Sequence, residues 1–110
     1  MKLPNGDKAV VDMRKLTEYC LSPDHPTGKH KARVLASAMG MTVRDAEPLR
    51  RVLLAAAKDG EAIPAKTDAY GSRFVIESLT EGVRGPARIR SVWVVRSPGD
   101  PPRLLTCHVV

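Results

Sequence analysis

The stretch Ala87-Arg88-Ile89-Arg90-Ser91-Val92-Trp93-Val94-Val95-Arg96 decides the fold. Side chains of different character alternate along it, it is rich in β-branched residues and it contains neither glycine nor proline, which is typical of a β-strand. Turn-forming pairs flank it on both sides, Gly85-Pro86 before and Pro98-Gly99 after. The sequence therefore predicts a strand over 87–96 that is joined to its neighbours by tight turns.

Similar stretches flank this strand, at 72–79 and 103–109, and short turn segments separate all three. Such short connections join antiparallel neighbours, so we expect a meander. A fourth strand at the edge, around 61–68, is compatible with the pattern, although Pro64 limits its pairing because proline has no N–H to donate. The second half of the chain is thus predicted to form an antiparallel sheet of three to four strands.

The first half has the 3.6-residue periodicity of helices. We expect one helix from about Asp12 to Cys20, a second from Thr27 or Gly28 to Met39, and a third to about Lys58 that a capping box of Thr42 and Asp45 opens. Helices followed by strands indicate an α+β fold, with two to three N-terminal helices on one face of the sheet. Residues 1–110 are predicted to form a single domain.

The chain is small and basic, with 110 residues and a net charge of +6. A basic surface favours polyanions such as RNA as partners, although arginine-rich surfaces also occur without that function. The two cysteines, Cys20 and Cys107, form no CxxC pair, so we expect buried free thiols, no metal site and no cofactor. No apolar run is long enough for a signal peptide core or a membrane span, so a cytoplasmic protein is expected.

Strand alternation predicts which side chains share a face of the sheet. The face that packs on the helices should carry Phe74, Ile76, Ile89, Ser91, Trp93, Val95, Leu105, Cys107 and Val109. The other face should carry Arg73, Val75, Glu77, Arg88, Arg90, Val92, Val94, Arg96, Leu104, Thr106 and His108. This second face is basic and can bind phosphates, while its simpler interpretation is the solvated face of an antiparallel sheet.

The turn Ser22-Pro23-Asp24-His25-Pro26-Thr27-Gly28-Lys29-His30-Lys31 leads into the second predicted helix. Free backbone N–H groups at Thr27-Gly28, together with Lys29 and Lys31, would make a cradle for a phosphate. His25 is a candidate for acid–base chemistry, and its alternative is a histidine that caps the turn. The spacing Cys20-x4-His25-x4-His30 matches no common zinc-binding pattern, so no zinc site is predicted.

Metal-independent cleavage of RNA needs a base for the 2′-hydroxyl, an acid for the leaving 5′-oxygen and cations for the phosphate. We predict His25, Lys31 and Arg73 as catalytic residues. The substrate-binding candidates are Lys29, His30, Tyr70, Arg88, Arg90, Thr106 and His108. The alternative is a binding module that docks nucleic acid or an acidic protein on the same face without catalysis.

Several motifs along nearly the whole chain carry a resemblance: Lys15-Leu16-Thr17-Glu18-Tyr19, His25-Pro26-Thr27-Gly28, Asp68-Ala69-Tyr70-Gly71-Ser72-Arg73-Phe74 and Arg90-Ser91-Val92-Trp93-Val94. The chain resembles an uncharacterised bacterial domain family found alone and as the C-terminal effector of contact-dependent and other polymorphic toxins. That family is similar, more loosely, to metal-free ribonucleases of the barnase, EndoU, colicin and RelE type. The resemblance implies a toxin setting with a cognate immunity protein or antitoxin, and it departs at His108, where an aromatic residue is expected.

Overall fold

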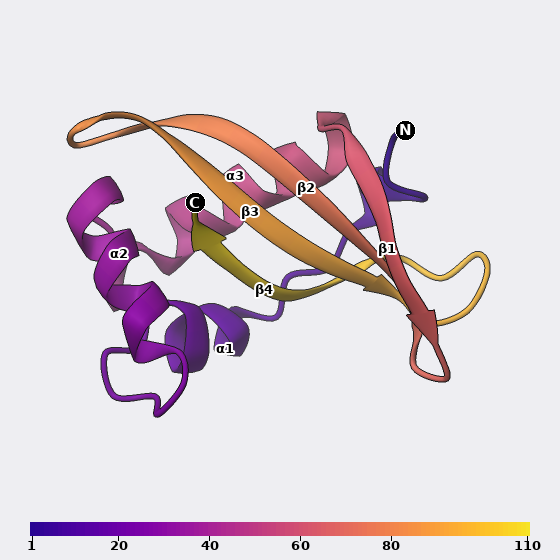
Figure 1. Ribbon diagram of the computed structural model, residues 1–110, viewed down its shortest axis with the longest axis horizontal. Coiled ribbons are helices and arrows are strands. Elements are labelled where there is room, and N and C mark those ends of the chain that lie inside the picture. The colour runs from indigo at the N-terminus through magenta and orange to yellow at the C-terminus, as the bar shows by residue number, and fades with distance from the viewer.

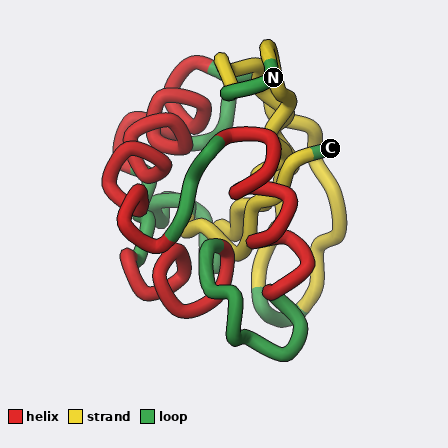
Figure 2. Tube along the Cα trace, turned by 90° about the vertical axis from the view of Figure 1, so that its left-hand side faces the viewer, coloured by secondary structure: helices red, strands yellow, loops and turns green.

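A four-stranded antiparallel sheet forms one layer of the molecule, and the helices lie against one of its faces (Figures 1 and 2). The computed structural model describes residues 1–110. The strand order follows the chain: β1 (Ala62–Asp68), β2 (Gly71–Gly82), β3 (Gly85–Val95) and β4 (Arg103–Val109). The predicted α+β class and the antiparallel meander are confirmed, including the edge strand that contains Pro64.

The helices occupy the N-terminal half, as predicted. A short 3₁₀ turn, η1 (Gly6–Lys8), precedes α1 (Met13–Lys15), which continues into η2 (Leu16–Cys20); α2 (Lys29–Met39), η3 (Val43–Asp45) and α3 (Ala46–Asp59) follow. Asp12 caps α1 by accepting a hydrogen bond from the backbone N–H of Arg14. None of these helices is long and apolar enough to cross a membrane.

Local caps explain where α2 ends and where the segment that leads into α3 begins. Gly40 ends α2 in the left-handed conformation, with φ of 67°, which glycine adopts without strain. Thr42 and Asp45 form the expected capping box, in which the Asp45 carboxylate accepts from the backbone N–H of Thr42 at 2.9 Å. The chain therefore changes direction between α2 and α3 in a connection whose capping box the sequence predicts.

The core lies between α3 and the inner face of the sheet. Leu49 and Leu53 of α3 are fully buried together with Ile76, Ile89 and Trp93 of the central strands. The Trp93 indole N–H donates to the Ser91 hydroxyl at 2.9 Å, so the polar atom of the buried ring has a partner. These positions confirm the predicted inner face of β2 and β3.

The predicted alternation along β4 is wrong at its first residues. Leu104 is buried, at 3% exposure, and pairs with Trp93 on the inner face, which packs on the helices. Leu105 instead lines a hollow on the open face, the face of the sheet that the helices do not cover. The register shifts between Val92 and Trp93, because one extra residue of β4 is accommodated in a β-bulge. After the bulge the expected alternation holds, with Cys107 buried and Thr106 and His108 opposite Val92 and Arg90.

Candidate functional site

Lys31 connects α2 to the open face of the sheet at the β4 edge. Its ammonium group lies 3.5 Å from the Thr106 hydroxyl of β4 and 5.7 Å from the centre of the Tyr19 ring. A cation at that distance is attracted by the face of an aromatic ring, which holds the long side chain in place. Lys31 is half-buried and forms no ion pair, so its positive charge is available to an anion.

His108 lies on β4, two residues after Thr106 and near the Lys31 side chain of α2. Its Nδ1 atom is buried without a hydrogen-bond partner, although the residue as a whole is partly exposed. Burial lowers the pKa of His108, and the nearby charges of Lys31 and Arg90 lower it further, against an opposing effect of Glu77. The imidazole is therefore neutral near pH 7, the form that accepts a proton.

Arg90 is directly opposite His108 in the register of β3 and β4, and opposite Glu77 in the register of β2 and β3. Its guanidinium donates to Glu77 Oε1 from Nε at 2.9 Å and from Nη2 at 2.6 Å, and Arg88 lies 3.8 Å from the other carboxylate oxygen. The two arginines lower the pKa of Glu77, whose carboxylate is therefore ionised. These three residues line a hollow of about 580 Å³ beside the site.

His25 stabilises the turn that precedes α2. Its Nδ1 accepts from the backbone N–H of Gly28 at 2.9 Å and from that of Thr27 at 3.1 Å, and its ring packs edge-on against Tyr19, with the centroids 4.6 Å apart. The expectation of a phosphate cradle at Thr27-Gly28 is wrong, because these N–H groups are already bonded. With Nδ1 as an acceptor, the hydrogen of the neutral ring is on Nε2.

The remaining predicted site residues lie elsewhere. Arg73 pairs with Asp68 at 2.8 Å, and together with the exposed Tyr70 it lines a hollow of about 560 Å³ at the other end of the open face. Arg73 is four residues from Glu77 along β2, which corresponds to about 13 Å. Lys29 and His30 are exposed on α2, and it is Lys31 of this helix that hydrogen-bonds Thr106.

Cys20 of η2 and Cys107 of β4 are buried free thiols that face each other beneath Thr106. Their contact lowers the pKa of Cys20 to about 7, against the effect of burial, and raises the pKa of Cys107. The Lys31 charge also favours the Cys20 thiolate. Burial of both thiols confirms the sequence-based prediction. No group of three or more histidine, cysteine or acidic side chains comes together to hold a metal ion.

The family follows from a comparison of the whole sequence. A family model described as a domain of unknown function, DUF6883, matches residues 2–110. The chain belongs to the DUF6883 family. Searches of curated proteins and of solved structures found no match. The DUF6883 match establishes the uncharacterised family, and it carries no activity with it.

Two site residues of this DUF6883 domain escaped the sequence analysis. Tyr19 is not among the predicted site residues, yet it is half-buried between His25 and Lys31. Glu77 was placed on the basic face without a role, because alternation gives the face of a residue but not its partner across the strands. The spacing of β2 and β3 around a tight turn at 82–85 was the available signal, since the turn fixes Glu77 opposite Arg90.

Proposed function

We propose that this domain is a metal-independent ribonuclease. Its site lies on the open face at the β4 edge and is formed by Lys31, Arg90, Thr106 and His108. The observation that carries the proposal is the neutral, partly exposed His108 imidazole, which has a lowered pKa and lies near two cations, Lys31 and Arg90. Perturbed titratable groups beside charge partners are typical of catalytic sites. RNA supplies both the proton that such a base removes and the phosphate that such cations bind.

In the proposed reaction, His108 removes the proton of a 2′-hydroxyl, and the 2′-oxygen attacks the adjacent phosphorus. The bond from phosphorus to the 5′-oxygen breaks, and the leaving oxygen takes a proton from the Lys31 ammonium group. The products are a 2′,3′-cyclic phosphate and a free 5′-hydroxyl. Arg90 stabilises the charge that develops on the phosphate oxygens, for which it exchanges part of its interaction with Glu77.

His25 is a positioning residue in this proposal. Its Nδ1 is bonded to the backbone, and its ring holds Tyr19, over which Lys31 lies. Lys29 and His30 would extend the basic surface along α2, and Arg73, Arg88 and Tyr70 would bind nucleotides farther along the RNA. Exposed aromatic rings such as that of Tyr70 are suited to stacking on bases.

The proposed biological setting is that of a toxin domain acting in the cytoplasm and neutralised by a cognate immunity protein or antitoxin. The net charge of +6 supports an acidic partner of this kind, because complementary charge steers association. Such a partner would cover Lys31 and Arg90 and thereby block access to RNA.

The test is incubation of the protein with tRNA and total RNA in EDTA. We expect cleavage by the wild type, a loss of at least about 100-fold in His108→Gln, the scale of general acid–base catalysis, and a similar loss in Lys31→Gln. Arg51→Gln, on the far side of α3, is the matched control for loss of charge. His25→Asn, which keeps an acceptor for the cap, should retain more activity than His25→Ala. Intact RNA with folded wild-type protein would refute the proposal.

A second candidate is an RNA-binding module without catalysis. The observation that favours it is that Glu77 already holds both Arg88 and Arg90, and the backbone holds His25 Nδ1. RNA binding that weakens steeply with salt, without any product in EDTA, would favour this function over the ribonuclease.

A further inference from the structure

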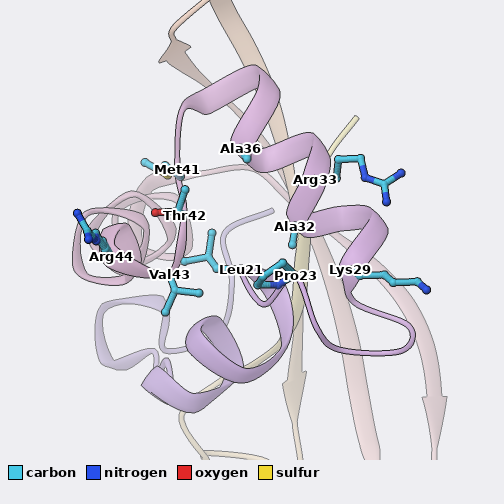
Figure 3. Close-up of a pocket in the computed structure, with 10 residues that line it drawn as sticks. All are labelled: Leu21, Pro23, Lys29, Ala32, Arg33, Ala36, Met41, Thr42, Val43 and Arg44. Carbon is cyan, nitrogen blue, oxygen red and sulfur yellow. The ribbon is translucent and has the colours of Figure 1, made fainter.

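A separate pocket, of about 410 Å³, lies on the side of α2 that faces η3. Leu21, Pro23, Ala32, Ala36, Met41 and Val43 form its apolar walls, drawn from the loop after η2, from α2 and from the segment before α3 (Figure 3). Its volume is within the range of cavities that hold small organic ligands. Val43 is 41% exposed, so apolar surface remains open to solvent there.

Three cations border the apolar walls. Figure 3 shows Lys29 and Arg33 on one side of the pocket and Arg44 on the other, with their charged groups directed away from the apolar walls. None of the three forms an ion pair, whereas Arg14, Arg50, Arg51, Arg73, Arg88 and Arg90 all pair with carboxylates.

We propose that this pocket binds a small anionic amphiphile, a molecule with a carboxylate or phosphate group on an apolar body. The apolar body would occupy the space between Leu21, Ala36 and Val43, where it would cover exposed apolar surface. The anionic group would lie at the border, where Lys29, Arg33 or Arg44 can swing over it, because exposed side chains of this length change rotamers freely. Apolar walls with a few polar groups at one border are typical of small-molecule sites.

This pocket shares Lys29 with the basic surface proposed to contact RNA, but it contains none of the residues proposed for the catalytic step. Lys29, Arg33 and Ala36 follow one another at helical spacing and share one side of α2, whereas Lys31 projects toward β4. A ligand in the pocket therefore leaves Lys31 and His108 uncovered, and failure of either proposal leaves the other standing.

The test is titration of ¹⁵N-labelled protein with octanoate, followed by amide chemical shifts. We expect saturable shifts confined to residues 21–23, 29–36 and 41–44, and weaker or absent shifts with octylammonium, which has the same tail and the opposite charge. The triple variant Lys29→Gln, Arg33→Gln, Arg44→Gln should bind octanoate at least about tenfold more weakly. Ala36→Trp, which places a ring in the pocket from an exposed helix position, should abolish binding.

The matched control is Arg50→Gln, Arg51→Gln, Lys58→Gln, which removes the same charge from α3 and should bind octanoate like the wild type. Equal affinity for octanoate and octylammonium, shifts outside the pocket, or binding unchanged in Ala36→Trp would overturn the proposal. Shifts at the pocket with an acidic tripeptide containing leucine, but none with octanoate, would also overturn it in favour of a protein segment as the occupant.

Discussion

At the scale of single residues, the environment decides what each histidine can do. His25 and His108 are both half-buried, yet His25 Nδ1 accepts two backbone N–H groups and His108 Nδ1 has no partner. The sequence identified both as candidates, because the type and spacing of residues are visible in it. Their different roles depend on contacts from other elements, such as Lys31 beside His108, which no local pattern reveals.

The lowered pKa of His108 makes a prediction about stability. The unfolded chain binds a proton at His108 at a higher pH than the folded chain does, so the folded state loses stability as the pH falls below about 6.5. Glu77 and Asp68, whose pKa values are also lowered, add a further loss at more acidic pH, below about 4.5. Urea unfolding of the wild type and of His108→Gln at a series of pH values measures both effects.

We expect the loss of stability that begins below pH 6.5 to disappear in His108→Gln, and the loss at more acidic pH to remain. The same slope in both proteins between pH 6.5 and 5.5 would show that the His108 environment differs from the one described.

At the scale of elements, turns and caps were the most predictable features, and strand register the least. Thr42 and Asp45 marked the start of the segment that leads into α3 correctly, because caps depend on local backbone chemistry. The β-bulge that exchanges Leu104 and Leu105 between the two faces was invisible, since it depends on how β4 meets Val92 and Trp93. The sequence therefore located Thr106 and His108 on the open face but misplaced the residues before them.

The turn between β1 and β2 depends on glycine more strictly than the turn between β2 and β3. Gly71 and Gly85 have similar positive φ angles, 124° and 106°. A Cβ atom on Gly71 would lie 2.4 Å from the Val95 carbonyl oxygen, whereas one on Gly85 would have no neighbour within 4 Å. Gly85→Ala should cost about 1–3 kcal/mol from backbone strain, and Gly71→Ala clearly more. Thermal unfolding of both variants provides the comparison, and an equal loss would contradict the described packing of Val95.

At the scale of the whole molecule, one core between α3 and the sheet supports both the open face and α2. Periodicity predicted its inner-face residues, since burial of an apolar stripe is what drives a helix onto a sheet. The meeting of Lys31 with Thr106 could not be predicted, because these residues are 75 positions apart in the chain and their contact depends on where α2 docks beside β4. The candidate site is thus a product of tertiary packing, while the fold class is readable from local pattern.

Two leucine substitutions test the position of this core. Leu53 of α3 is fully buried and Leu79 of β2 is 69% exposed. Leu53→Ala should lower the free energy of unfolding by about 2–5 kcal/mol, because it leaves a cavity. Leu79→Ala should change it by less than about 0.5 kcal/mol. Denaturant titrations of the two variants give the comparison, and similar losses would mean that α3 does not pack as described.

The central claim is that Lys31, Arg90 and His108 together cleave RNA through its 2′-hydroxyl without a metal. The most direct measurement is the rate of cleavage, in EDTA, of a short RNA and of the same oligonucleotide with a single 2′-deoxy substitution, with the products identified by mass. We predict cleavage to a 2′,3′-cyclic phosphate in the unmodified RNA and no cleavage at the substituted position. Cleavage at the substituted position, or no cleavage of either oligonucleotide by folded protein, would contradict the claim.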